Sequence, residues 1–565
     1  MKKIISLFLL IILTTTSGLR ADYIWPIQRP KRLSGTFCEY RRIKFHHGID
    51  VGCSGIKGYN IYAANKGHVI TVMYQQFGIG FALVLKHPDG KTTLYGHLDR
   101  FSPIILRSRR VRAVYDRILN RKNFRIDFKS PEIPVSRGAV IGYSGESGVG
   151  IEHFHFELRD RDDALLNPLL NGINIIDNDY PVIQRVFFVP LDGYSHVNGL
   201  SEPIAYNVKL VETGEKKLYS LEADKTPILG GRIGVKVSVF DRTGNSNRCG
   251  IYKISSFLDG RMHYSFAFDR VPKEQTYRMG LYYDYDNSSM SRFTYYLYFK
   301  PDEKGILEYD TDGKQIKMKI LCSDAHGNTS ALEFPFQTSR ALKEPHYKIK
   351  HNLKPGRELE LVSDDKTFCI SFERNAALYK EMVQLEKRDP YEFRGTGLTS
   401  KSDIYYISPT NLCLDKPAEI TLRYAGSDYR KIAVFVRNGY NSVRYLGRGY
   451  DSRKQQFQVT SRRMGEFFLV RDDAPPKIKF RSRKRVRRNR PIAIRVSDRG
   501  TGLDLESVHL TVDGRQVAWD YNFDKGYIEI LAHNKIWNRG SHVIHIRLQD
   551  KAGNKTPMLR LTYKV

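Results

Sequence analysis

Residues 153–157 read His-Phe-His-Phe-Glu, and this stretch decides how the first part of the chain is interpreted. Alternate side chains of a β-strand point to opposite faces, so His153 and His155 share one face while Phe154 and Phe156 enter a core. Two neutral imidazoles side by side on a rigid strand suit Zn²⁺. We therefore expect a strand that is apolar on one side and bears a site on the other.

Two earlier stretches supply matching residues, His46-His47-Gly48-Ile49-Asp50 and Tyr95-Gly96-His97. Gly48 permits a bend that lets His46 and Asp50 converge, and His47 competes with His46 for the first position. Three protein ligands and one open position are typical of a catalytic zinc, which lowers the pKa of its water toward about 7. The residues thus predict a zinc hydrolase. The other histidines are interpreted as packed or surface residues: His68, His87, His196, His263, His326, His346 and His351.

In this order the stretches resemble the lysostaphin-like (LytM-type) zinc endopeptidases, over roughly residues 40–172. The family patterns His-x-Gly-x-Asp, Tyr-x-His, Val-x-x-Gly-x-x-Ile-Gly-x-Ser-Gly and His-x-His-Phe-Glu match residues 46–50, 95–97, 135–145 and 153–157, and Asn167-Pro168 fits the usual close. The resemblance implies Zn²⁺ bound by His46, Asp50 and His155, with family spacing favouring His46 over His47. It implies His97 and His153 as the catalytic pair, and peptidoglycan cross-links as the substrate.

Two features depart from the family pattern. The loop of residues 146–152 is slightly longer, with Glu152 where the family commonly has proline, and a strongly basic insertion occupies about residues 101–134. Both lie near the expected cleft, so they bear on substrate placement. Every ligand position is filled, which favours an active enzyme over family members that only activate other wall hydrolases.

The N-terminus and the charge point to the cell envelope. A basic start followed by a short apolar run predicts a signal peptide over residues 1–21, the alternative being an uncleaved membrane anchor. We expect an exported protein of the periplasm, envelope or extracellular space, with no membrane span after signal removal. The net charge of +30 attracts anionic polymers. Behind a signal peptide these are envelope polymers and not nucleic acid; a solvated basic surface explains the charge equally well.

The fold class is predicted to be mainly β, with an antiparallel β peptidase domain followed by immunoglobulin-like β-sandwich domains. Alternating strands that end in Asp-x-x-Gly-Asn turns recur at residues 233–245, 316–328 and 544–554, and a related version spans 492–502. One Asp per turn is too few for Ca²⁺, so the turns are taken as structural. The expected domains are 22–175 (peptidase), 176–342 (β-sandwich), 343–473 (β-rich) and 474–565 (immunoglobulin-like).

Six cysteines in an exported protein suggest disulfides, and we expect neighbours in sequence to pair as Cys38–Cys53, Cys249–Cys322 and Cys369–Cys413.

Two other functions stay open besides the enzyme. One is a non-catalytic envelope protein that binds the wall or activates another hydrolase. The other is an adhesin-like binder of acidic polymers, whose affinity would survive deletion of the residues before about 175.

Overall fold

The structure is a computed structural model. It describes residues 23–41, 44–76, 78–115, 123–148, 152–214, 217–244, 246–346, 352–438, 443–480, 492–517, 519–522, 525–530 and 540–564. The expected signal peptide lies outside these ranges. Within the described ranges no helix combines the length and the apolar character that a membrane crossing requires.

The chain is mainly β and begins with one antiparallel sheet of 11 strands. Seven of them follow the order β18-β10-β9-β5-β4-β3-β6. In addition, β1 pairs with β9, β7 pairs with β3, and β8 pairs with both β5 and β2. The bounds are β1 (Ile49–Gly52), β2 (Asn60–Tyr62), β3 (Gly67–Gln75), β4 (Gly80–Lys86), β5 (Thr92–Phe101), β6 (Phe124–Asp127), β7 (Pro134–Val135), β8 (Val140–Ser144), β9 (His153–Arg159), β10 (Leu165–Leu166) and β18 (Arg270–Val271), with a 3-10 turn η2 (Pro168–Leu170).

Strand β9 lies at the centre of this sheet, between β1 and β5. Its side chains alternate as the sequence predicts. Phe154, Phe156 and Leu158 are fully buried in the core of the unit. The opposite face presents His153, His155 and Glu157, so the site rests on a strand that the core holds in place.

The basic insertion lies between β5 and β8. It contains two short helices, α1 (Pro103–Leu106) and α2 (Arg109–Tyr115). It also supplies β6 and β7, which both pair with β3. The chain beyond Tyr115 lies outside the described residues until residue 123.

The second unit is another 11-stranded sheet, and its strands β15, β11, β13, β14 and β22 form a closed path through parallel pairings of β22 with β14 and β15. The bounds are β11 (Val182–Pro190), β12 (His196–Val197), β13 (Ile204–Thr213), β14 (Lys217–Leu221), β15 (Ile228–Phe240), β16 (Lys253–Leu258), β17 (Arg261–Ala267), β19 (Thr294–Tyr296), β20 (Leu307–Tyr309), β21 (Gln315–Ser323) and β22 (Thr329–Ser339), with η3 (Lys273–Gln275) and η4 (Arg278–Leu281).

The third and fourth units each consist of two sheets around a core. The third contains β23 (Leu359–Val362), β24 (Phe368–Phe372), β25 (Gln384–Arg388), β26 (Leu398–Ser400), β27 (Ile404–Ser408), β28 (Ala418–Arg423), η5 (Tyr429–Lys431), β29 (Ile432–Arg437), β30 (Val443–Gly447), β31 (Tyr450–Asp451), β32 (Gln456–Ser461) and β33 (Glu466–Asp472). The fourth contains β34 (Lys477–Phe480), β35 (Ile492–Ser497), β36 (Leu503–Val512), β37 (Arg515–Gln516), β38 (Trp519–Asn522), β39 (Tyr527–Ile530), β40 (Ser541–Asp550) and β41 (Leu559–Lys564).

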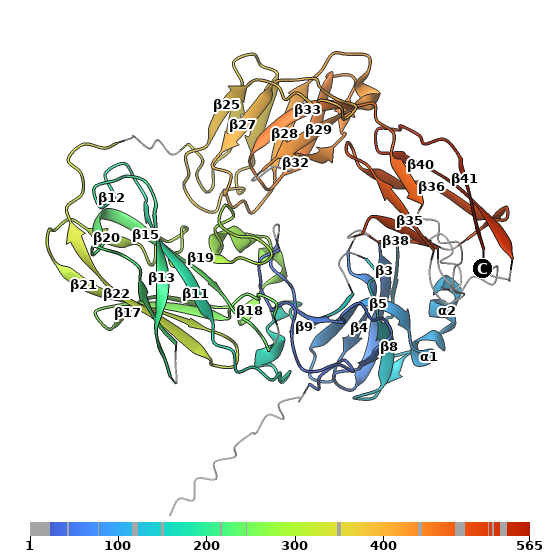
Figure 1. Cartoon of the computed structure of the whole chain (residues 1–565), viewed down its shortest axis with the longest axis horizontal. Helices are drawn as coiled ribbons and strands as arrows, with labels where there is room; N and C mark the ends of the chain where they lie inside the picture. Colours follow the sequence, from blue (N-terminus) through green and yellow to red (C-terminus); the bar gives the residue numbers. More distant parts are fainter. Residues whose placement is uncertain are drawn as a thin grey trace, which may run out of the picture.

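The four units form a ring, in which the fourth unit returns to the first (Figure 1). At this closing contact the Tyr74 hydroxyl donates to Asp520 at 3.3 Å. The Lys525 ammonium donates to Glu152 at 3.0 Å and to Glu146 at 3.4 Å. Both glutamates belong to the loop that precedes β9, so the C-terminal unit contacts the loop that leads into the site.

The expected disulfides are wrong: all six cysteines are free. Cys38 lies in the core of the second unit and Cys53 in the core of the first, so these two thiols lie in separate cores. Cys369 faces away from the core of the third unit, because strand alternation buries Phe368 and Ile370 instead. Cys413 is buried inside that same core.

Candidate metal centre

The register of β1, β9 and β5 brings the predicted residues together. In the antiparallel pairing of β1 with β9, Asp50 lies directly opposite His155. On the other side of β9, Gly96 lies opposite His155. Cross-strand partners in a sheet have their Cβ atoms about 4.5–5.5 Å apart, so this register alone places a carboxylate beside an imidazole.

Two glycines of the site lie where a side chain would collide with neighbouring atoms. A Cβ on Gly48 would lie 2.0 Å from the Phe156 carbonyl oxygen, and a Cβ on Gly96 would lie 2.4 Å from the Ile79 side chain. Neither glycine has a positive φ among the described residues. The chain bends at Gly48, as the sequence predicts, and the missing side chain also leaves space against the backbone of β9.

A bulge in β5 directs His97 toward the site. Strict alternation would send His97 to the face opposite Gly96. Between the pairs Leu83–Tyr95 and Phe81–Leu98 the register shifts, so that Gly96 and His97 together oppose Ala82. His97 adopts a left-handed φ of 56°, which is uncommon for a residue with a Cβ. Its ring centre lies 4.3 Å from that of His153, and bulges of this kind re-aim a side chain.

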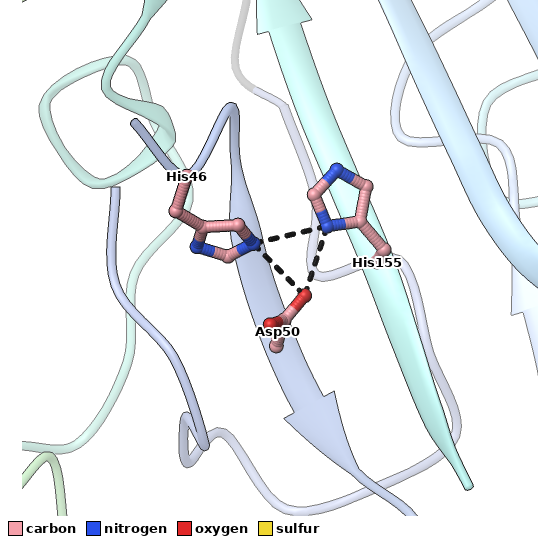
Figure 2. A group of neighbouring side chains, drawn as sticks. All are labelled: His46, Asp50 and His155. Carbon is pink, nitrogen blue, oxygen red and sulfur yellow. Dashed lines mark hydrogen bonds and ion pairs between the residues drawn. The ribbon is translucent and has the colours of Figure 1, made fainter. Parts of the chain in front are cut away.

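Three side chains meet at one point (Figure 2). His155 Nδ1 lies 2.8 Å from Asp50 Oδ1, and His46 Nε2 lies 3.1 Å from the same oxygen. The two ring nitrogens lie 3.1 Å from each other. All three residues are buried, and two imidazole nitrogens with one carboxylate oxygen form a donor set that suits Zn²⁺.

Each of the three residues has an outer partner that orients it. His46 Nδ1 lies 2.7 Å from the Thr36 carbonyl oxygen, and His155 Nε2 lies 3.1 Å from Glu157 Oε1. The outer nitrogens therefore carry protons, and the inner nitrogens direct their lone pairs at the same space. Asp50 turns Oδ1 inward while Oδ2 accepts a hydrogen bond from Arg41 at 2.5 Å. Converging lone pairs with fixed outer partners are what a bound cation requires.

The pKa values of Asp50 and His155 show that the cluster favours a positive charge at its centre. Burial opposes the charge of Asp50, but His46, His153 and Arg41 hold its pKa well below the usual range. Burial alone would lower the pKa of His155, yet hydrogen bonds to Asp50 and Glu157 raise it to about 9. A proton on His155 thus takes the place that a metal cation would fill.

His97 has different electrostatics from His155. Its Nδ1 lies 2.8 Å from the Ser147 carbonyl oxygen, which makes Nε2 the basic nitrogen. Burial, together with the neighbouring His153 and His155, lowers the pKa of His97 well below its usual value. His97 is therefore neutral near pH 7. His153 Nε2 lies 3.7 Å from Asp50 Oδ1, at the edge of the three-residue cluster.

His47 points away from the three-residue cluster. Its Nδ1 lies 3.7 Å from Glu157 Oε1, and burial lowers its pKa to about 3. Sequence reasoning did not identify Thr36 and Arg41 as partners of the site. Glu157 did have a signal, since its position two residues after His155 places it on the same face of β9.

The site lies in an open cleft of about 1310 Å³, which is lined by His46, His97, His153 and His155. Basic side chains from two units surround this floor: Arg41, Lys44, Arg125 and Arg159 from the first, Arg248 and Lys273 from the second. The insertion therefore reaches the cleft through Arg125. Arg41, Arg159 and Lys273 pair with carboxylates that line the same cleft, those of Asp50, Glu157 and Asp163.

An antiparallel β unit with two imidazoles and a carboxylate on the floor of an open cleft has the arrangement of a metallohydrolase. The chain carries a peptidase family M23 domain of the LytM type, since residues 44–114 match the model of that family. This range includes His46, Asp50 and His97. No curated protein matches the chain.

Several solved structures are similar to parts of the chain. The SpoIIQ–SpoIIIAH pore forming complex matches at 18% identity with a TM-score of 0.20, covering 27% of this chain and 91% of that one. A catalytic-domain mutant of the prophage-encoded M23 protein EnpA from Enterococcus faecalis matches at 24% identity with a TM-score of 0.16, covering 23% and 88%. Lysostaphin matches at 16% identity with a TM-score of 0.18, covering 39% and 89%.

Proposed function

We propose that the chain is an exported zinc metalloendopeptidase that hydrolyses peptide cross-links in peptidoglycan. The observation that carries this proposal is the convergence of His46, Asp50 and His155, each with its own outer partner, on the floor of a cleft. In this proposal these three residues bind Zn²⁺. The M23 domain supports the choice of a peptide bond in the wall.

Zinc, when bound, polarises the scissile carbonyl group and lowers the pKa of water toward about 7. The side chains of the cleft supply proton transfer. His97, held by the Ser147 carbonyl, presents Nε2 as a base that is neutral near pH 7. His153 stands beside it, so the pair can take a proton from the attacking water and stabilise the charge that develops on the carbonyl oxygen.

The lining of the cleft supports an anionic substrate. Peptidoglycan stem peptides bear carboxylates, and cationic side chains such as Arg125 and Arg248 are among those that line the cleft. We propose that Arg125 and Arg248 bind such carboxylates on either side of the scissile bond. The net charge of +30 favours retention on anionic envelope polymers as well.

The test uses the full-length chain without its predicted signal peptide, defined peptidoglycan, and mass analysis of the products. The proposal expects about one Zn²⁺ per chain and new amino and carboxyl ends that disappear with a chelator. The His155→Ala variant should bind no Zn²⁺ at this site and release no product. Cleavage that continues unchanged in chelator would contradict the metal assignment.

The same experiment separates the enzyme from a non-catalytic envelope protein. A chain that binds Zn²⁺ and peptidoglycan but releases no peptide would have the second function. Wall binding that survives deletion of residues 22–175 would assign the affinity to the later units, as the adhesin-like alternative expects.

A further inference from the structure

A second cluster of carboxylates lies at the junction between the first and second units. A small cavity of about 20 Å³ is lined there by three aspartates, Asp177, Asp241 and Asp324. Asp177 belongs to the segment that joins the two units, Asp241 follows β15, and Asp324 follows β21. Thr36 and Phe37, from the segment that precedes β1, also line the cavity. The volume is enough for one ion or one water molecule.

Two carboxylate oxygens in this cavity have no hydrogen-bond partner among the described residues: Asp177 Oδ2 and Asp241 Oδ1. The Asp177 side chain is 0% exposed and Asp241 is 1% exposed, so bulk water does not solvate them. Buried charges in proteins are normally paired or coordinate a metal. Both residues line the small cavity.

The rest of the cluster is held in place by its own hydrogen bonds. Asp324 accepts hydrogen bonds from the backbone N–H groups of His326 and Asn328, at 2.8 and 2.9 Å. The Asn328 side-chain amide donates to Asp324 at 2.6 Å and to the Asp177 carbonyl oxygen at 3.2 Å. The turn therefore fixes the carboxylate of Asp324 next to the joining segment.

Neither a shared proton nor a histidine neutralises the cluster. A proton shared between Asp177 and Asp241 would appear as a hydrogen bond between their oxygens, and both oxygens lack a partner. His326 Nδ1 lies 3.9 Å from Asp177 Oδ2, too far for a hydrogen bond, and its side chain is at the rim. Burial and the adjoining Asp324 raise the pKa of Asp177 to about 6, and burial with Asp177 and Asp324 raises that of Asp241.

Three carboxylates without a thiolate form a hard, oxygen-rich donor set, which favours Ca²⁺ over softer ions. We propose that Asp177, Asp241 and Asp324 bind one Ca²⁺ ion that joins the first unit to the second. Each strand-end turn by itself supplies one Asp, which is why the sequence predicts that the turns do not bind calcium. In the fold, two such turns and the joining segment each contribute one aspartate to the same cavity.

The position of the cavity gives this ion a structural role. Next to it, the Thr36 hydroxyl donates to the Gly250 carbonyl oxygen at 2.9 Å. Thr36 also presents the carbonyl oxygen that holds His46, at 2.7 Å. An ion at the junction would thus fix the segment that orients a residue of the cleft, although the proposal does not depend on the peptidase function.

A similar cluster in the fourth unit serves as an internal control. Asp472, Asp498 and Asp550 each bring a ligand atom within 4.8 Å of the others, as Asp177, Asp324 and His326 do at the junction. However, Asp472 Oδ2 accepts from the Thr501 N–H group at 2.7 Å and from its hydroxyl at 2.9 Å, and Oδ1 accepts from the Ala474 N–H group at 3.1 Å. These donors satisfy Asp472, so the proposal covers only the first cluster.

The test titrates the chelator-treated full-length chain with Ca²⁺ by calorimetry, and with Tb³⁺ by luminescence, for which Tyr252 on the cavity wall is a sensitiser. We expect one Ca²⁺ per chain, displacing Tb³⁺. Asp241→Asn and Asp177→Asn should each lower the Ca²⁺ affinity by about 100-fold or more, because even outer-shell changes at metal sites cost roughly 10–100-fold. Asp472→Asn should leave the affinity unchanged.

Several results would overturn the proposal. The absence of Ca²⁺ binding to the unmodified chain does so whether or not the variants fold. Loss of binding in Asp472→Asn with retention in Asp241→Asn assigns the ion to the fourth unit, and binding of Zn²⁺ but not Ca²⁺ at the cavity contradicts the hard-ion assignment. Protease cleavage within residues 171–181 should slow when Ca²⁺ is added, and an unchanged rate contradicts the joining role.

Discussion

The Glu157→Gln substitution tests whether the outer partners tune the proposed zinc site. Glu157 is 4% exposed, and it links His155, at 3.1 Å, to Arg159, at 2.6 Å. Glutamine keeps the shape but removes the charge that makes His155 a better ligand. Loss of such a partner lowers metal affinity roughly 10–100-fold, or about 1.4–2.7 kcal/mol.

Proton competition makes this loss depend on pH. Because the pKa of His155 is raised to about 9, a proton must leave before a metal binds. At pH 7.5 this competition already lowers the affinity of the unmodified chain by about 30-fold, from a pKa difference of about 1.5. Without the Glu157 charge that pKa falls and the competition weakens. The loss of affinity in Glu157→Gln should therefore be largest above pH 9 and smaller at pH 7.5.

The assay is zinc transfer to a chromophoric chelator of known affinity, measured at pH 7.5 and 9.5. Glu132→Gln serves as the control, since Glu132 is exposed and pairs only with Arg110 at 3.2 Å among the described residues. An unchanged zinc affinity at pH 9.5 would refute the orienting role of Glu157. A loss of equal size at both pH values would refute the proton-competition argument.

Other predictions concern the cleft, the core and the ring. His97→Ala should retain zinc and lose about 10²–10⁴-fold in turnover, while His155→Ala should lose both, as metal analysis and product release would show. Phe156→Ala should destabilise the first unit by about 3–5 kcal/mol in denaturant unfolding, because its ring is fully buried. Hydrogen bonds with Glu146 and Lys525 outweigh the effect of burial and lower the pKa of Glu152 to about 2. The closing contact should therefore be intact above about pH 4.5 and weaken as the pH falls toward 2. Small-angle scattering would report the opening, which Lys525→Glu should reproduce at pH 7.

Sequence periodicity predicted the part of the site that lies on one strand. The alternation of His153, Phe154 and His155 directly gives the two faces of β9, and the structure has this arrangement. Periodicity could not place His97, because its direction depends on a bulge against Ala82 that breaks the alternation. The Thr36 carbonyl group is a backbone atom and has no sequence signature.

The convergence of the three aspartates at the junction was also not predictable from the sequence. Asp177, Asp241 and Asp324 stand far apart in the chain, and only the ends of β15 and β21 bring them to one cavity. The disulfide prediction failed for the related reason that neighbours in sequence, such as Cys38 and Cys53, belong to different cores.

The closing contact of the ring has a thermodynamic consequence. An exposed ion pair such as that of Lys525 with Glu152 contributes only about 0–1 kcal/mol on its own. Because the intervening units tether the partners, the contact is intramolecular, and a weak affinity is enough to populate it. Higher ionic strength would then increase the fraction of molecules in which the first and fourth units are apart, while each unit keeps its own fold.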